Sequence, residues 1–362
     1  MLETPLAPAH ALEAKEAECL LFDLVATPSP SGREGEASHL LVDWMAQRGF
    51  EAFVDESGSA VGIRGQGPRE LVLLGHIDTV PGQLPVHTEG RTLHGRGSVD
   101  AKGPLAAFAA AAAMVEPPAG TSLVVIGATE EEAATSRGAR HALRQFKPRA
   151  CLIGEPSRWD RITLAYKGRL LADWLWEGPL AHSAGPVPTP AEHAVAFWQA
   201  VQEYAQECNR GCKGEFSRLE PSLRAINSAQ HGAYGSARMQ LGLRLPPDLT
   251  TEAVIKRLRA LGEGASLAFH GREEAFMAPK NNLLTRCMLA AVRSNGGRPR
   301  FVHKTGTSDM NVVGPEWNCP IAAYGPGDSS LDHTPEERLD LDEFQRAIAV
   351  LRDALTNMLL QV

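Results

Sequence analysis

The sequence lacks several features that would place a protein in a special class. Its six cysteines are scattered without paired Cys-x-x-Cys spacing, so we expect reduced thiols and no zinc ribbon. The N-terminus shows no apolar core of a secretory signal. The alanine-rich run at residues 106–115 is shorter than the about 20 residues that cross a membrane. We therefore expect a cytoplasmic protein without a membrane partner.

An excess of positive charge is also missing. The net charge of -7 at pH 7 argues against a general nucleic-acid binder. What is present is the composition of an ordinary globular protein, with 43% hydrophobic and 22% charged residues. The length of 362 residues is enough for two domains.

One stretch organises the chain. The run LVLLG at residues 71–75 is typical of a strand buried on both faces of a sheet, and it leads into His76 and Asp78. Polar side chains past such a strand lie at the edge where open α/β sheets bind ligands. In an extended His-x-Asp both side chains point the same way, so Asp78 can accept the second ring N–H of His76. A structural histidine remains the alternative.

Two more apolar strands end in the same manner. VVIGA at residues 124–128 leads into Glu130, Glu131 and Glu132, and ACLIG at residues 150–154 leads into Glu155. Between them and the first strand, a glycine-rich turn places Asp100 near a helix start. Adjacent carboxylates at one sheet edge repel unless a cation compensates, although an acidic helix start would explain the glutamates as well. The recurrence favours a metal site.

The order of strands and helices predicts the fold class. Strands and helices alternate up to residue 162 and again from residue 281, which indicates an α/β domain with a mostly parallel sheet flanked by helices. Long antiparallel strands and two helices fill the middle. We predict a catalytic domain over residues 1–162 and 275–362, interrupted by an α+β sandwich over residues 163–274.

The motifs GHIDTVP, GRGSVDAKG, TEE, GEPS, HSAGP and DHTPEE together resemble the M20 metallopeptidase family. The resemblance spans nearly the whole chain. It implies a zinc exopeptidase-like hydrolase of amide bonds that holds two Zn²⁺ per subunit, for which Co²⁺ can substitute. It also implies that the inserted domain is a lid through which the protein forms a homodimer.

The resemblance implies a role for each matching residue. His76 and Glu155 would hold one zinc, Glu131 and His333 the other, and Asp100 would bridge both. Asp78 would orient His76, and Glu130 would be the general base. A shift of one residue would move base and ligand to Glu131 and Glu132. His182 of HSAGP would reach across the dimer to stabilise the oxyanion. Arg244, Asn282 and Lys304 lie where family members hold the substrate.

Further details are similar to the branch of the family that releases lysine or ornithine from a small acidic amino-group carrier protein in lysine and arginine biosynthesis. Between Arg137 and Arg169, nine basic residues face two acidic ones, which either dock such a carrier or form a solvated helix face. Two alternatives stay open. One is a deacylase of small substrates such as N-acetylornithine, and the other is a non-catalytic metal-binding interaction protein.

Overall fold

The structure is a computed structural model that describes residues 12–182 and 185–361. The chain forms two compact units. Unit 1 comprises residues up to Leu164 together with Ala278–Val302 and Ser308–Val362, and unit 2 comprises Ala165–Met277 and His303–Thr307. The sequence predicted that the inserted domain runs from residue 163 to residue 274. In the structure the main segment of unit 2 runs from Ala165 to Met277. The short return of the chain through residues 303–307 was not predicted.

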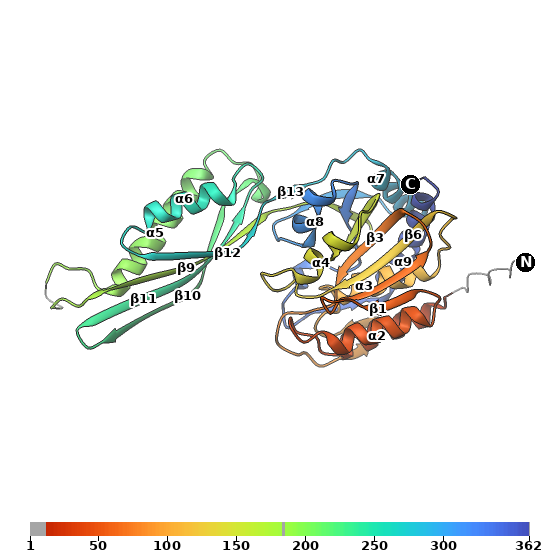
Figure 1. The fold of residues 1–362 in the computed structure, drawn as a ribbon, viewed down its shortest axis with the longest axis horizontal. Helices are drawn as coiled ribbons and strands as arrows, with labels where there is room; N and C mark the ends of the chain where they lie inside the picture. The colour runs from red at the N-terminus through yellow and green to blue at the C-terminus, as the bar shows by residue number, and fades with distance from the viewer. Residues whose placement is uncertain (1–11, 183–184, 362) are drawn as a thin grey trace, which may run out of the picture. The chain divides into compact units, whose positions relative to one another are not determined.

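Unit 1 is built on a mixed sheet between helices (Figure 1). Its elements are α1 (Ala14–Ala26), α2 (Gly35–Ala46), β1 (Glu51–Val54), β2 (Ala60–Gly65), β3 (Arg69–His76), β4 (His87–Glu89), β5 (Thr92–His94), α3 (Lys102–Ala113), β6 (Thr121–Ala128), α4 (Arg137–Gln145), β7 (Ala150–Gly154), α7 (Leu283–Ser294), α8 (Asp309–Trp317), β15 (Ile321–Ala323), the 3-10 turn η2 (Ser329–Leu331), β16 (Arg338–Asp340) and α9 (Leu341–Leu359). The chain changes unit within or beside β8 (Arg161–Tyr166), β13 (Phe276–Met277) and β14 (Arg300–Lys304).

The sheet order is β1-β2-β6-β3-β7-β15-β8-β13, with β14 paired to β8. The central pairs β6–β3, β3–β7 and β7–β15 are parallel. The outer pairs β1–β2, β2–β6 and β15–β8 are antiparallel. The predicted parallel sheet is therefore correct for its centre, and the outer strands make the sheet mixed. Among the described residues, β16, β5 and β4 form a separate three-stranded sheet.

The central strands are buried because both of their faces are covered. Leu71 and Leu73 belong to a core shared with α1, α3 and α9. Val72 and Leu74 alternate with them and therefore point to the other face. All twelve residues of α3 are buried, since its alanines let the helix approach the sheet closely. At Gly75 a Cβ atom would lie 3.3 Å from Leu105 of that helix, which explains the glycine before His76.

Unit 2 is a four-stranded antiparallel sheet covered on one face by two helices (Figure 1). Its elements are β9 (Gly168–Pro179), α5 (Pro190–Cys208), the 3-10 turn η1 (Glu215–Ser217), β10 (Glu220–His231), β11 (Tyr234–Leu245), α6 (Thr251–Leu261) and β12 (Ser266–Glu273), in the sheet order β10-β11-β9-β12. The ring of Trp174 on β9 stacks on Phe197 of α5 at 5.4 Å, which seals the core. This is the α+β sandwich that the sequence predicted.

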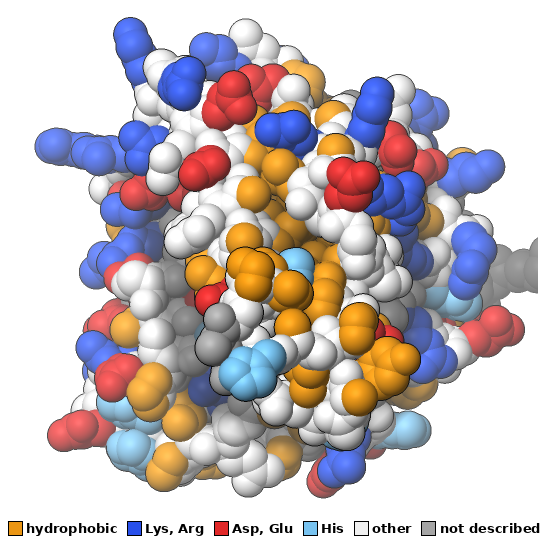
Figure 2. Space-filling view, turned by 90° about the vertical axis from the view of Figure 1, so that its left-hand side faces the viewer, with side chains coloured by type: hydrophobic (Ala, Val, Ile, Leu, Met, Phe, Trp, Pro, Cys, Tyr) orange, Lys and Arg blue, Asp and Glu red, His pale blue; other side chains and the backbone are white. Residues whose placement is uncertain are grey.

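Unit 2 also carries exposed apolar side chains. Val187, Val195, Ile226 and Tyr234 are between 48% and 64% exposed. Figure 2 shows a face of the molecule on which hydrophobic side chains gather around histidines. Among the helices of residues 12–182 and 185–361, none is both long enough and apolar enough to cross a membrane.

Candidate metal centre

The three parallel strands β3, β6 and β7 deliver their polar ends to one edge of the sheet. In their registers His76 pairs with Ala128, and Gly75 pairs with Gly154. The residues that follow Ala128 and Gly154 therefore emerge beside His76. This alignment brings the predicted ligands together from segments that are far apart in the sequence.

A first group of possible ligand atoms comes from His76, Glu131 and Glu155, whose atoms all lie within 4.8 Å of one another. The ring of His76 is only 2% exposed, and its Nε2 atom lies 4.0 Å from Glu155 Oε1. The same Nε2 lies 3.2 Å from Asp100 Oδ1. Asp100 thus borders this group as well.

A second group comes from Asp100, Glu132 and His333, again with all atoms within 4.8 Å. The Nε2 atom of His333 lies 2.9 Å from Asp100 Oδ2 and 2.9 Å from Glu132 Oε1. The two oxygens of Asp100 therefore face different histidines, His76 and His333. A carboxylate in this position can bridge two cations, as the resemblance implied for Asp100.

Asp78 hydrogen-bonds to the backbone of one residue from each of the two ligand groups. Its carboxylate accepts hydrogen bonds from Ser31 Oγ (2.6 Å) and from the backbone N–H groups of Glu131 and Glu132 (3.0 Å each). The second ring nitrogen of His76, Nδ1, lies 3.0 Å from the backbone oxygen of Asp78 and 3.5 Å from its carboxylate. The predicted orientation of His76 thus comes mainly through the backbone oxygen. Burial alone would raise the pKa of Asp78, but its contacts with His76 lower it.

The three glutamates are arranged differently from the first of the two registers that the sequence left open. Glu130 accepts a hydrogen bond from Thr135 Oγ1 (2.6 Å) and lies 3.6 Å from Arg137, outside both ligand groups. Glu132, rather than Glu131, is grouped with His333. The cause is local, because a left-handed φ of 59° at Glu130 turns the backbone and Asp78 then holds the next two N–H groups. This is the one-residue shift that the sequence left open.

The electrostatics of the centre favour a bound cation. Burial, followed by repulsion from Asp100, raises the pKa of Glu155 to about 8. Burial also raises the pKa of Glu131 and of Glu132. The hydrogen bonds that His333 donates to the carboxylates of Asp100 and Glu132 raise its pKa to about 10. Carboxylate oxygens and imidazole nitrogens at this spacing fit zinc, and they also fit cobalt or manganese.

Glu337, which the sequence analysis did not single out, holds the turn that carries Asp100. Its buried carboxylate accepts the backbone N–H groups of Gly97, Val99 and Asp100 at 2.9 to 3.1 Å and pairs with Arg96 at 2.7 Å. The motif DHTPEE contained this residue, but only the three-dimensional position reveals its partners.

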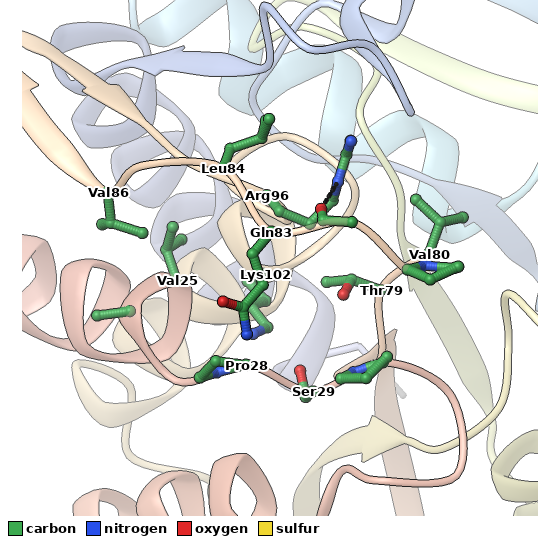
Figure 3. Close-up of a pocket in the computed structure, with 14 residues that line it drawn as sticks. Val25, Pro28, Ser29, Thr79, Val80, Gln83, Leu84, Val86, Arg96 and Lys102 are labelled. Carbon is green, nitrogen blue, oxygen red and sulfur yellow. Dashed lines mark hydrogen bonds between the residues drawn. The ribbon is translucent and has the colours of Figure 1, made fainter.

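Lys102 follows Asp100 and is equally buried. Its Nζ atom donates to the backbone oxygens of Leu24 (2.8 Å) and Thr27 (2.7 Å) at the end of α1, and burial lowers its pKa to about 8. Figure 3 shows Lys102 and Arg96 beside Thr79 at a small cavity of about 170 Å³. The lysine therefore ties the turn that carries Asp100 to the first helix of unit 1.

The predicted substrate residues fall in different places. Arg244 donates to Thr307 Oγ1 (2.6 Å) within unit 2, where Lys304 and His182 also belong. Asn282 belongs to unit 1 and caps α7: its Oδ1 accepts from Thr285 N at 2.9 Å, and its Nδ2 donates to Pro279 O at 2.8 Å. The side chain of Asn282 is thus engaged in a structural role that competes with a substrate contact.

The family model that describes peptidase family M20/M25/M40 matches residues 72–357. The chain belongs to this family. A LysW-lysine hydrolase of Deinococcus radiodurans is 50% identical over 355 residues, which cover 96% of this chain and 98% of the relative. A putative LysW-lysine/LysW-ornithine hydrolase of Thermococcus kodakarensis is 36% identical, covering 96% of this chain and 93% of the relative. The resemblance to the M20 family and the hydrolase class predicted from the sequence are both confirmed.

Solved structures give the same fold. An M20 family metallo-carboxypeptidase from Sulfolobus solfataricus superposes with a TM-score of 0.79 at 17% identity, covering 95% of this chain and 99% of that chain. A tripeptidase from Staphylococcus aureus superposes with a TM-score of 0.78 at 13% identity, covering 97% and 100%. The M20 fold of this family member, with its α/β sheet domain and α+β insertion, is therefore confirmed.

Proposed function

We propose that this M20 hydrolase releases lysine from the LysW carrier protein by metal-dependent hydrolysis of an amide bond. The observation that carries the proposal is the 50% identity to a LysW-lysine hydrolase over nearly the full length of both chains. The two adjacent ligand groups at the sheet edge supply the chemistry that such a reaction needs. Ornithine on the same carrier is a second substrate, since several relatives carry both in their names.

Two zinc ions would bind at this edge. His76 and Glu155 would hold one ion, Glu132 and His333 the other, and Asp100 would face both. When bound, such ions lower the pKa of a water molecule toward about 7 and polarise the carbonyl of the scissile amide. Cobalt suits the same donor atoms.

Glu131 takes the role of general base in this proposal. Its half-buried carboxylate lies beside His76 and Glu155, and the residue is adjacent in sequence to the proposed ligand Glu132. It would accept the proton of the attacking water and deliver it to the leaving amine. Two hydrogen bonds from the backbone of Glu131 and Glu132 to Asp78 fix the position of this carboxylate.

Two residues of unit 2 also have roles in this proposal. His182 would stabilise the oxyanion in the site of the neighbouring subunit of a homodimer, and Arg244 would bind the carboxylate of the released amino acid. The dimer is supported by exposed apolar side chains of unit 2, such as Val195 on α5 and Ile226 on β10. β10 is also an edge strand of its sheet, and an unpaired edge is a ready site for a second copy.

The test is a comparison of substrates. Purified enzyme with two equivalents of zinc is given lysine-loaded LysW, ornithine-loaded LysW or N-acetylornithine, and the free amino acid is measured. We expect release from LysW with a kcat/KM at least about 100-fold above that for N-acetylornithine, because only the carrier offers contacts beyond the pocket. Equal or faster hydrolysis of N-acetylornithine would replace the proposal with the small-substrate deacylase. Metal binding without hydrolysis of any of the three would support a non-catalytic role.

A further inference from the structure

An arginine-rich groove lies in unit 1, apart from the two ligand groups. It has a volume of about 370 Å³ and is lined by Trp159, Arg161, Gly297, Arg298 and Arg300, with Asp160 as its acidic residue. Three arginines and one acidic residue thus line the groove. This local excess of positive charge opposes the net charge of -7 of the whole chain.

The arginines of the groove are available for a partner. Within the described residues, the side chains of Arg298 and Arg300 are exposed and make no hydrogen bond or ion pair. The side chain of Arg161 is 43% exposed and lies 4.0 Å from Asp160, the limit of an ion pair. The arginines of α4 differ, since Arg140 donates to Thr135 O (3.0 Å) and Arg144 lies 3.3 Å from His141.

The floor of the groove is rigid. A Cβ atom at Gly297 would lie 2.9 Å from the ring of Trp159, so the glycine backbone packs directly on the indole. Tyr324 Oη donates to the backbone oxygen of Trp159 (2.6 Å), and the guanidinium carbon of Arg346 lies over the Trp159 ring, 5.4 Å from its centroid. The groove is therefore a preformed surface, which lowers the entropic cost of binding.

The groove lies at the same edge of the sheet as the metal centre. β8, which begins at Arg161, is antiparallel to β15, and β15 is parallel to β7. The start of β8 therefore meets the carboxyl ends of β7 and β15, and the hydrogen bond from Arg300 N to Asp160 O (3.3 Å) places β14 there too. Trp159 comes four positions after the proposed ligand Glu155, a span of at most about 14 Å.

We propose that this groove binds an acidic segment of the protein substrate and so docks the carrier beside the metal centre. The inference rests on the proposed function for the identity of the carrier. Guanidinium groups pair with carboxylates in bidentate fashion. Three arginines from two chain segments suit an extended run of carboxylates better than one small anion. Their field also attracts an acidic protein before contact.

The test uses two variants with the same change of charge. Arg298→Glu combined with Arg300→Glu reverses two charges in the groove, and Arg140→Glu combined with Arg144→Glu reverses two on α4 as the matched control. All four side chains are exposed, so both variants should fold. Circular dichroism, metal content and hydrolysis of a small acylated amino acid verify that the metal centre is intact in each.

The first measurement does not depend on LysW. A fluorescent peptide of ten glutamates is titrated with each zinc-loaded enzyme at low salt, with a peptide of ten glutamines as reference. We expect the groove variant to bind the glutamate peptide at least about tenfold more weakly than the wild type, and the control variant to stay within about twofold. Equal binding by groove variant and wild type, or equal loss in both variants, would overturn the docking groove. Displacement of the peptide by equimolar inorganic phosphate would also overturn it, in favour of a simple anion site.

The second measurement uses lysine-loaded LysW. The groove variant should raise KM about tenfold and leave kcat within about twofold, since docking and not chemistry is affected. If the wild type cleaves LysW-lysine and the groove variant has an unchanged KM, the groove proposal fails while the proposed function stands. If the wild type does not cleave LysW-lysine, the proposed function fails, and the peptide titration still decides whether the groove binds acidic chains.

Discussion

The carboxylate of Asp78 accepts a hydrogen bond from the backbone N–H of Glu132 over 3.0 Å. This bond joins the end of β3 to the turn after β6, two segments that meet only through the parallel pairing of the sheet. It fixes which of three adjacent glutamates points at His333. Asp78 is not a metal ligand in this proposal. It nevertheless sets which of the three glutamates serves as one.

The base is tested by Glu131→Gln. The amide cannot accept the proton of the attacking water, so kcat should fall about 10²- to 10⁴-fold while two metal ions remain bound. Glu130→Gln serves as the matched control and should keep kcat within about twofold, because Glu130 contacts Thr135 and Arg137 instead. Kinetics with metal analysis separate the two. An active Glu131→Gln beside an inactive Glu130→Gln would restore the register predicted from the sequence.

The ligand role of Glu132 predicts a different defect. Glu132→Gln removes a charged oxygen that lies 2.9 Å from His333 Nε2, and an amide is a poorer metal ligand. Elemental analysis after dialysis should find about one metal ion per chain instead of two. If this variant still binds two metal ions tightly, Glu132 is not a metal ligand.

Much of this site could be predicted from the sequence, for a physical reason. Buried parallel strands read as unbroken apolar runs, so the sequence showed His76 at the end of β3 and Glu155 directly after β7. The register of the glutamates was not, because it depends on the left-handed φ of Glu130 and on Asp78, which lies about 50 positions earlier. The pattern of apolar residues along the sequence reveals neither the backbone angle of Glu130 nor its neighbours' contact with Asp78.

Other features depend on long-range pairing. β10 (Glu220–His231) was not predicted, because its mostly exposed residues lack a regular apolar alternation and its register comes from β11. The small sheet joins Arg338 to His94 across the chain. The arginine-rich groove combines residues 159–161 with residues 296–300, so a count over residues 137–169 captured only Arg161 of its three arginines.

The support from Asp78 predicts a graded loss of metal affinity. Asp78→Asn keeps the shape but weakens the bonds to two backbone N–H groups and to Ser31, so zinc affinity should fall about 10- to 100-fold. Ser31→Ala removes a single one of these bonds and should cost less. Competition with a chromogenic chelator measures both. An unchanged zinc affinity in Asp78→Asn would mean that the turn after β6 keeps its conformation without the carboxylate of Asp78.

Removal of metal should abolish activity and lower stability together. Dialysis against a chelator should eliminate turnover, and zinc or cobalt should restore it. Because ions bound to the folded protein stabilise it by mass action, about 2.7 kcal/mol at a free concentration of 100 Kd, the melting temperature should fall on removal. Differential scanning fluorimetry follows it. Full activity in protein shown by elemental analysis to be free of transition metals would exclude the two-metal mechanism.

The cross-subunit role of His182 predicts complementation. His182→Ala and Glu131→Gln should each be inactive as homodimers, because the first lacks the oxyanion donor and the second lacks the base. In a mixed dimer, one site receives Glu131 from its own chain and His182 from the partner. Equal mixing with subunit exchange should therefore restore about one quarter of the wild-type kcat per chain, since half of the dimers are mixed and each has one complete site. Mixing His182→Ala with Glu131→Gln/His182→Ala is the control and should stay inactive. Mass spectrometry of differently tagged chains verifies exchange, and exchanged mixtures without activity would place His182 in the site of its own subunit or outside the reaction.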